Sequence, residues 1–348
     1  MGSEAPGHPA IAVPATLSAW LQTTLGDPGP FELTPLGGGN SNETLELRSP
    51  AARRILRRPP AAAIAPSAHN VAREDRILRA LEGSGVPAPR PGAVCEDASV
   101  FEVPFLVMEA VDGVAVTEAL PSAYPPSPQA LPQVGERVVE ALADLHAVPW
   151  RQVGLADFGR PEGFLERQVE RWQRQLDGYR FRELPYHAEL AGWLAAERPQ
   201  AGEPAIMHGD FHLDNCLISA AEPIGVTAII DWEMATIGDP LLDLGLLLAF
   251  WGPDRPERPA MPRVQAASRL PGAPSREALA AHYAERSGRS IERLDWYMAL
   301  AFWKLATIVE GAYAQYTEGK LRSRYARELG DDVPALLAEA AGFAGLRR

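Results

Sequence analysis

The sequence predicts an α+β protein of two lobes: a small β-rich N-terminal lobe over residues 1–112 and a larger, mainly helical C-terminal lobe over residues 113–348. Apolar residues between positions 31 and 111 alternate as they do in strands, whereas those beyond Gly113 recur at helical spacing. Two short β-like segments interrupt the helical half, and they contain its most polar motifs. A chain of 348 residues is long enough for each lobe to bury its own core.

The N-terminal half is expected to begin with a leader rich in Pro, Gly and Ala over residues 1–15, followed by a short helix over residues 17–25. Antiparallel strands are predicted between residues 31 and 58, where short apolar runs are separated by a glycine cluster and end at a pair of prolines. Apolar spacing then predicts a helix over residues 68–81, and residues 103–111 are typical of a buried strand.

The C-terminal half is predicted to consist of amphipathic helices around two β segments, which cover residues 205–218 and 225–231. The predicted helices are Leu131–His146, Phe164–Leu176 and Ala188–Glu197, and helices resume at Leu241. Residues 253–274 contain many prolines and predict a loop. A long helical pair is expected from Arg276 to the C-terminus.

Composition excludes several classes of function. A formal net charge of -12 argues against a non-specific nucleic-acid binder, although an acidic surface could attract a cationic substrate. Cys95 and Cys216 are far apart, so neither a disulfide framework nor a zinc site is indicated. The apolar stretch at residues 241–251 is too short to span a bilayer. We therefore expect a cytoplasmic monomer or homodimer with no nucleic-acid or membrane partner.

The polar motif of the first β segment runs from His208 to Asn215 and has the pattern H-x-D-x-x-x-x-N. The second β segment is a β-branched run that ends in Asp231. Phosphoryl transfer needs a carboxylate that deprotonates the acceptor hydroxyl, and oxygen ligands that hold magnesium against the nucleotide. Asp210 and His208 are therefore candidate catalytic residues, and Asn215 and Asp231 are candidate metal ligands. Each could instead be structural, but their order and strand context favour the functional interpretation.

This arrangement resembles the kinase catalytic loop, and Asp231 stands where kinases keep the metal-binding Asp of their DFG triplet. With residues 238–245, which resemble the segment that anchors this loop, nearly the whole chain is similar to the aminoglycoside phosphotransferase and choline kinase-like family. The closest likeness is to the branch found as the kinase-like domain fused to some acyl-CoA dehydrogenases. The resemblance implies a bilobal protein-kinase-like fold, Mg²⁺, and ATP or GTP as co-substrate.

The glycine cluster comprises residues Gly37 to Asn42 and lies between two predicted strands. Glycines at such a position let the backbone approach phosphates. An ordinary hairpin turn would have a similar sequence. The resemblance makes this segment the nucleotide-covering loop, with Gly38, Gly39, Ser41 and Asn42 as its contact residues.

A kinase small lobe also needs a cation on its third strand, fixed by a glutamate on the following helix. The only lysines of the chain are Lys304 and Lys320, so Arg57 is the candidate cation and Glu74 its partner. Because a strand register can slip by one, Arg58 is the alternative. The two-residue period of a strand places these arginines on opposite faces. Glu74 could alternatively be a solvated helix carboxylate.

The strand over residues 103–111 matches the inter-lobe hinge of this superfamily. Backbone groups of Glu109 and Val111 would then meet the adenine edge, with Met108 behind it. Burial in the core alone would also explain Met108.

The resemblance predicts a small-molecule kinase that moves the γ-phosphate of ATP or GTP to a hydroxyl group. The acceptor stays open among an antibiotic, a sugar, a choline-like alcohol and a hydroxyacyl-CoA, because a fold does not choose its substrate. Glu233, Trp251, Glu310 and Tyr313 are candidate pocket residues. The competing hypothesis is a nucleotide-binding pseudokinase or regulatory module without turnover.

Overall fold

The computed structural model describes residues 9–37, 42–59, 68–122, 124, 129–252, 255–321 and 324–346. The chain forms two compact units, of which the first comprises Met1–Asp112 together with Ala228–Glu233. The second unit comprises Gly113–Thr227 and Met234–Arg348. The segment Ala228–Glu233, which contains Asp231, therefore belongs to the β-rich unit.

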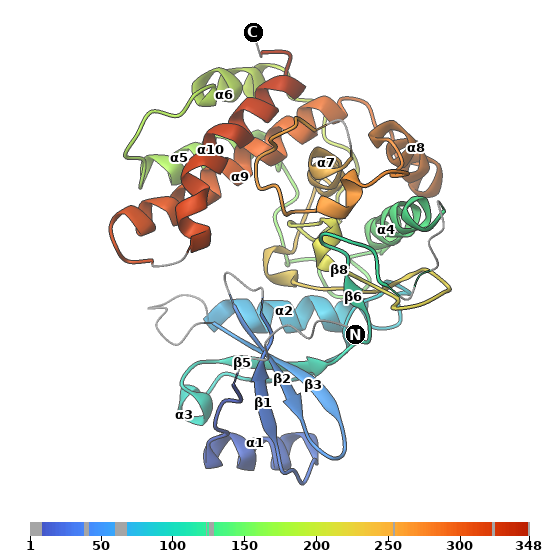
Figure 1. Ribbon diagram of the computed structural model, residues 1–348, viewed down its shortest axis with the longest axis vertical. Coiled ribbons are helices and arrows are strands. Elements are labelled where there is room, and N and C mark those ends of the chain that lie inside the picture. Colours follow the sequence, from blue (N-terminus) through green and yellow to red (C-terminus); the bar gives the residue numbers. More distant parts are fainter. Residues whose placement is uncertain are drawn as a thin grey trace. The chain divides into compact units, whose positions relative to one another are not determined.

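The first unit is built on a five-stranded antiparallel sheet with the strand order β1-β2-β3-β5-β4 (Figure 1). Its strands are β1 (Glu32–Pro35), β2 (Glu43–Arg48), β3 (Arg53–Arg58), β4 (Pro91–Cys95) and β5 (Phe105–Glu109). Helices α1 (Ala15–Leu25) and α3 (Ala98–Phe101) contribute to its apolar core, and α2 (Ala68–Leu81) packs against β4 and β5. Arginines of β3 therefore meet different helices, depending on the face to which each points.

The first unit departs from the sequence prediction at β4 and at the hinge strand. No strand was expected at Pro91–Cys95, because Pro91 and Gly92 have poor strand propensity. β4 is the edge strand, and its register shifts between Pro91 and Ala93, where a proline is tolerated. The hinge strand is shorter than the predicted residues 103–111, since β5 covers only Phe105–Glu109.

The second unit is mainly helical. Its helices are α4 (Ala130–Ala147), α5 (Glu166–Asp177), α6 (His187–Ala196), α7 (Leu241–Phe250), α8 (Arg276–Ser287), α9 (Leu294–Thr317) and α10 (Arg324–Phe343). Strands β6 (Val114–Ala115), β8 (Cys216–Ile218) and β9 (Val226–Ile229) share a sheet, and β7 (Ala205–Met207) pairs with β10 (Thr236–Gly238). Helix α9 packs between α7 and α10 and supplies much of the apolar core (Figure 1).

Two predictions for the second unit were wrong in detail. The helical pair expected from Arg276 onward is three helices, because α8 ends at Gly288 in the left-handed conformation, with φ of 67°. The β segment expected over residues 205–218 is two short strands, β7 and β8. The loop between these strands contains the motif from His208 to Asn215, which places the polar residues on irregular backbone next to rigid elements.

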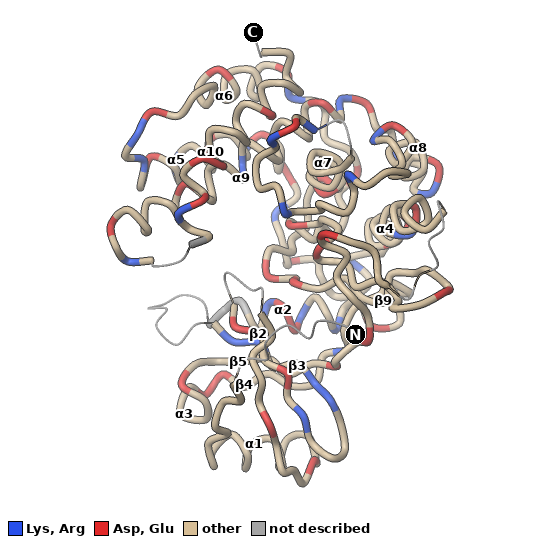
Figure 2. Tube along the Cα trace, in the orientation of Figure 1, with Lys and Arg blue, Asp and Glu red and all other residues tan. Residues whose placement is uncertain are grey.

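The α+β organisation, with strands concentrated in the first unit and helices in the second, is as the sequence predicted. Acidic and basic residues are interspersed along both units, and four arginines fall on the single strand β3 (Figure 2). None of the helices in the described ranges is both long and apolar enough to cross a membrane.

Candidate active site

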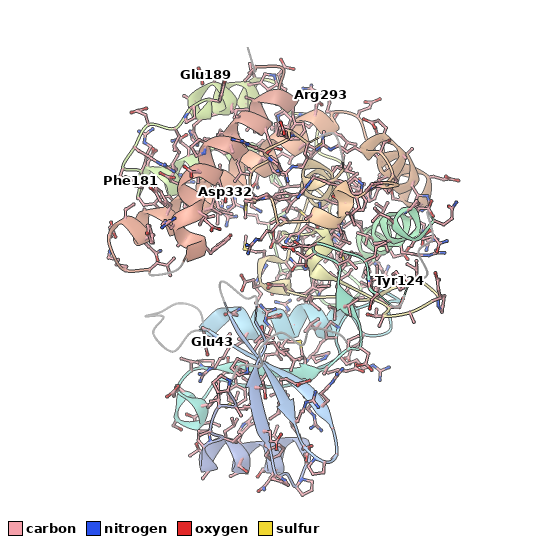
Figure 3. All side chains as sticks on the ribbon, viewed as in Figure 1. Glu43, Tyr124, Phe181, Glu189, Arg293 and Asp332 are labelled. Atoms are coloured by element: carbon pink, nitrogen blue, oxygen red, sulfur yellow. The ribbon has the colours of Figure 1, made fainter. Side chains whose placement is uncertain are left out.

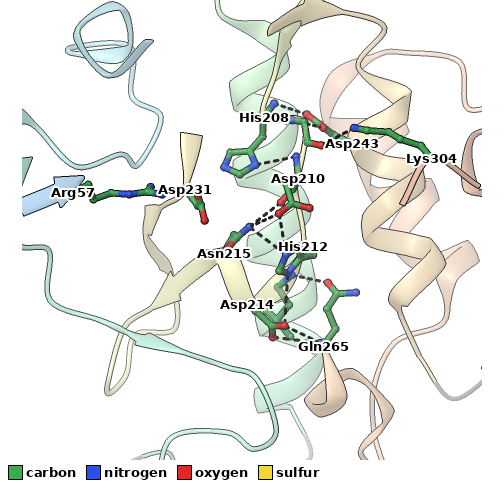
Figure 4. Close-up of polar contacts among 12 residues, drawn as sticks. Arg57, His208, Asp210, His212, Asp214, Asn215, Asp231, Asp243, Gln265 and Lys304 are labelled. Atoms are coloured by element: carbon green, nitrogen blue, oxygen red, sulfur yellow. Dashed lines mark hydrogen bonds and ion pairs between the residues drawn. The ribbon is translucent and has the colours of Figure 1, made fainter. Parts of the chain in front are cut away.

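A buried carboxylate from α7 holds the loop that precedes Asp210. The two oxygens of Asp243 accept the backbone N–H groups of His208 and Gly209, at 2.7 and 2.9 Å (Figure 4). Asp243 also faces the ring of His146, whose Nδ1 lies 2.7 Å from the Tyr283 hydroxyl. Charge-assisted bonds to a carboxylate are among the stronger hydrogen bonds of a protein, so this loop is fixed to α7 and, through His146, to α4 and α8.

Glycine is required at position 209 for two independent reasons. Its φ of +85° lies in the left-handed region, which L side chains adopt only with strain. A Cβ at this position would also overlap the backbone carbonyl of Met234. The glycine of the motif therefore lets the chain turn sharply, directly before Asp210.

Asp210 is partly open and is oriented by Asn215. The Nδ2 of Asn215 donates to the backbone carbonyl of Asp210 at 2.9 Å and approaches its Oδ2 at 3.4 Å. The Asp210 side chain remains 42% exposed, which leaves its carboxylate accessible. Because the amide nitrogen of Asn215 bonds within the loop, its Oδ1 is the atom left to ligate a cation. An amide oxygen is a ligand of the kind that Mg²⁺ prefers, since this ion is bound by oxygen atoms.

Several neighbours keep Asp210 ionised. Desolvation by the protein would raise the pKa of Asp210, but the rings of His212 and His208 and the ammonium of Lys304 lower it well below the ordinary value for Asp. A carboxylate at this position is thus available as a hydrogen-bond acceptor at neutral pH.

His208 is fully buried, and its Nδ1 lies 3.4 Å from the backbone nitrogen of Asp210. Its ring therefore contacts the backbone of Asp210, whereas the carboxylate of Asp210 is the more exposed group. This geometry supports a positioning role for His208.

The rest of the loop is held by Gln265, a residue that the sequence analysis missed. Its Oε1 accepts the N–H of Leu213 at 2.6 Å, and its backbone N–H donates to the carboxylate of Asp214 at 3.1 Å. Gln265 is fully buried and lies in the segment predicted only as a proline-rich loop. A single glutamine in such a segment gives no local signal, because its partners are about fifty positions away along the chain.

In the first unit, the predicted contact between Arg57 and Glu74 is present. Arg57 donates to Glu74 Oε1 and to Asp231 Oδ1, each at 2.7 Å, and lies 3.9 Å from Glu233 (Figure 4). Burial raises the pKa of Glu74 to about 7, although the guanidinium of Arg57 acts in the opposite direction. Three carboxylates thus share one guanidinium, which makes this cluster acidic overall.

Arg58 points to the other side of the sheet, as the strand period requires. Its guanidinium pairs with Glu43 at 2.8 Å and with Glu102 at 3.2 Å, and it lies 4.1 Å from the ring centre of Phe101. Figure 3 labels Glu43 on β2. Arg58 is buried, so it is not a surface residue, and its partners differ from those of Arg57.

Asp231 follows β9 with a φ of +69°, an unusual conformation for a residue other than glycine. Its side chain is 33% exposed, and only one of its oxygens bonds to Arg57. Asn42 is buried and donates from its Nδ2 to Glu233 at 2.7 Å, which links the end of the glycine cluster to the segment after Asp231. The other predicted loop contacts, Gly38, Gly39 and Ser41, lie outside the described residues.

The predicted hinge backbone is partly engaged. The N–H of Glu109 donates to the carbonyl of Arg90 at 2.9 Å, so only the carbonyl of Glu109 could meet a ligand. Within the described ranges, the N–H of Val111 forms no hydrogen bond, and Val111 is half-buried.

Two of the candidate pocket residues are closed off. Glu310 is fully buried and is bound by two nitrogens of Arg182, at 2.6 and 2.8 Å. Trp251 is buried, and its Nε1 donates to the carbonyl of Pro274. Tyr313 lies over the Arg182 guanidinium at 4.5 Å and near Phe181, which Figure 3 labels. The ion pair of Glu310 is therefore structural.

Comparison with known families decides the assignment. The model of the phosphotransferase enzyme family matches residues 32–282, which include the whole catalytic loop and its anchor. The chain belongs to the phosphotransferase enzyme family. Among curated proteins, this phosphotransferase is 32% identical to mouse acyl-CoA dehydrogenase family member 10 over 345 residues, covering 97% of the chain and 32% of the relative. The chain thus spans about a third of the length of that relative.

Solved structures agree with this assignment. A crystal structure from Ralstonia eutropha JMP134, provisionally named an aminoglycoside phosphotransferase, has a TM-score of 0.78 and 28% identity, covering 96% of this chain and 98% of its own. An aminoglycoside phosphotransferase in ternary complex with ADP and hygromycin B has a TM-score of 0.59 and 16% identity, covering 95% and 99%. The predicted kinase-like fold and family of this chain are therefore confirmed.

Proposed function

We propose that this phosphotransferase moves the γ-phosphoryl group of ATP or GTP to a hydroxyl group of a small molecule, with Asp210 as the base. The observation that supports this most directly is the partly exposed, ionised carboxylate of Asp210 at a rigidly anchored loop. The solved structure in ternary complex with ADP and hygromycin B has the same fold and supports the proposal, since it contains a nucleotide together with a second small molecule.

In the proposed reaction, Asp210 accepts the proton of the acceptor hydroxyl as the hydroxyl oxygen bonds to the γ-phosphorus. The bond between the γ-phosphorus and the bridging oxygen breaks, and the nucleoside diphosphate leaves. Asn215 Oδ1 and the Asp231 carboxylate would hold Mg²⁺, which neutralises charge on the phosphates when bound. His208 and Asp243 hold the backbone around the base and are positioning residues.

The nucleotide is proposed to bind the first unit through Asn42, the glycine cluster, Arg57 and the hinge backbone at Glu109 and Val111. Arg57 already bonds to Asp231, so it can orient this metal ligand as well as neutralise phosphate charge. Arginine differs from lysine here, because its fork bonds to Glu74 and Asp231 at once.

The proposal is tested by measuring phosphate transfer from labelled ATP and GTP to a panel of hydroxyl compounds. Asp210→Asn should lower kcat by several orders of magnitude and leave nucleotide affinity nearly unchanged, because the base touches the acceptor and not the nucleotide. Asp177→Asn, an exposed aspartate at the end of α5, is the matched control. Nucleotide binding by the wild type without transfer to any compound would support the pseudokinase hypothesis instead.

A further inference from the structure

Two cations lie on one buried indole close to the proposed base. Trp172 of α5 is only 4% exposed, and its Nε1 donates to Gln168 at 3.1 Å, which fixes the ring. The guanidinium carbon of Arg171 lies 5.0 Å from the Trp172 ring centre, and the ammonium of Lys304 lies 5.4 Å from it. Both distances are typical of cation–π contacts. The indole therefore brings together positive charges from α5 and α9.

Lys304 also contacts the peptide that leads into Asp210. Its Nζ donates to the carbonyl oxygen of Gly209 at 3.2 Å (Figure 4). That carbonyl and the N–H of Asp210 belong to the same peptide group, so the ammonium lies beside the backbone of the base. The charge of Lys304 is also one of the influences that lower the pKa of Asp210.

Among the described residues neither cation forms a close ion pair, although the carboxylates of Asp210 and Asp243 act on Lys304 and raise its pKa. In the part of the chain that the structure describes, no Asp or Glu oxygen lies within 4.0 Å of the charged nitrogens of Arg171 or Lys304. Arg182, on the segment after α5, shows the contrasting case, since it is bound by Glu310 at 2.6 Å. The chain contains 45 Asp and Glu residues, so the lack of a close ion pair at these two cations is not due to a small number of carboxylates.

The two cations can bind an anion, because Arg171 is exposed and Lys304 has N–H donors that the protein does not use. Burial lowers the pKa of Lys304, the carboxylates of Asp210 and Asp243 raise it, and the charge of Arg171 lowers it, with a net shift downwards. An ammonium has three N–H donors, and only the bond to Gly209 is made within the protein. The residue Lys304 as a whole is partly exposed.

We propose that Lys304, with Arg171 beside it, forms an anion subsite of the acceptor site, and that the acceptor has a carboxylate or a phosphate close to the hydroxyl group that is phosphorylated. The inference rests on the proposed function, because it gives the acceptor of that reaction a charge. It favours an anionic acceptor over the cationic one that the acidic composition also allows, because Lys304 lies beside Asp210. A ligand ammonium near the reacting hydroxyl would be repelled by Lys304.

Binding can be tested without turnover, because the chain has only two lysines. Protein labelled with ¹³C at the lysine Cε gives two side-chain signals, which Lys320→Arg assigns. Magnesium and a non-hydrolysable ATP analogue fill the nucleotide site. Glycolate and, in a second arm, inorganic phosphate should then shift the Lys304 signal saturably and leave Lys320 unmoved. Ethylene glycol, the neutral counterpart of glycolate, should shift neither. An unmoved Lys304 signal in both anion arms would overturn the proposal.

Turnover tests specificity with three matched acceptors: glycolate, ethylene glycol and ethanolamine. We expect the wild type to prefer glycolate, and Lys304→Met to lower its kcat/KM about tenfold or more, as loss of a charged hydrogen bond implies. Lys304→Arg should retain most of the preference, and Lys320→Met, at an exposed ion pair with Glu318, should change nothing.

The preference ratio separates charge recognition from mere support of the loop. Loss of support would slow glycolate and ethylene glycol equally, whereas loss of the subsite lowers their ratio towards one. An unchanged ratio in Lys304→Met, or a wild-type preference for ethanolamine, would refute the subsite. If none of the three compounds is phosphorylated, the turnover assay bears on the proposed function alone, and the signal of Lys304 decides the subsite.

Discussion

Replacing Arg57 by Met should destabilise the protein in a way that depends on pH. Glu74 is 1% exposed, and its pKa of about 7, against an ordinary value of 4.5, means that its ionisation opposes folding by roughly 3 kcal/mol once the pH exceeds 7. Arg57 limits that rise, since its charge lowers the pKa of Glu74. Without Arg57, the pKa of Glu74 rises further above 7.

The stability defect of Arg57→Met depends on pH through the ionisation of Glu74. At pH 6, Glu74 is protonated in the folded state of both proteins, so the pair contributes little to their difference. Above pH 7, wild-type Glu74 ionises beside Arg57, whereas the variant keeps its proton and loses further stability at about 1.4 kcal/mol per pH unit. This loss continues until the pH reaches the raised pKa of the variant. The Arg57→Met defect at pH 6 should therefore come from its contacts other than Glu74, and it should grow from pH 6 towards pH 9.

Urea unfolding at pH 6, 7, 8 and 9, followed by circular dichroism, measures this difference. In Arg57→Met/Glu74→Gln the growth with pH should disappear, because no ionisable group remains at that position. Arg57→Lys, which keeps a charge near Glu74, should reduce it. A defect of equal size at pH 6 and pH 9, or one that persists in the double variant, would refute the assigned coupling between Arg57 and Glu74.

Asp243→Asn should cost about 2–3 kcal/mol in urea unfolding, because one of two buried N–H groups loses its charged acceptor; a loss below about 0.5 kcal/mol would contradict this role. Gly209→Ala should cost at least about 1 kcal/mol in the same assay and lower kcat, because a Cβ at this position is strained and overlaps the carbonyl of Met234. Unchanged stability in this variant would contradict the requirement for glycine. Arg58→Ala should destabilise by about 1–3 kcal/mol while the nucleotide KM stays unchanged, and a raised KM would move the phosphate-binding role to Arg58. Asn215→Ala and Asp231→Ala should weaken magnesium-dependent nucleotide binding in calorimetry, and unchanged affinity in both would argue against them as metal ligands.

Local patterns in the sequence determined the fold class and the core of the candidate site. The change from a two-residue to a helical period marks the β-rich and helical parts, because each period follows from backbone geometry alone. The same alternation placed Arg57 and Arg58 on opposite faces of β3, and the structure shows them with different partners. The spacing of Asp210 and Asn215 also placed them in one loop, and the structure shows Asn215 bonded to the backbone carbonyl of Asp210.

Only the tertiary structure decided contacts between residues that are distant along the chain. Gln265 bonds to Leu213 of the His208–Asn215 loop from a segment with no regular pattern. Glu310 of α9 is paired with Arg182, which lies between α5 and α6. The neighbours of Lys304, namely Trp172 and the carbonyl of Gly209, come from elements that the sequence separates widely. Periodicity shows which face of an element is buried and not which residue covers it. The charge beside the base depends on that packing, and so it could be inferred only from the folded chain.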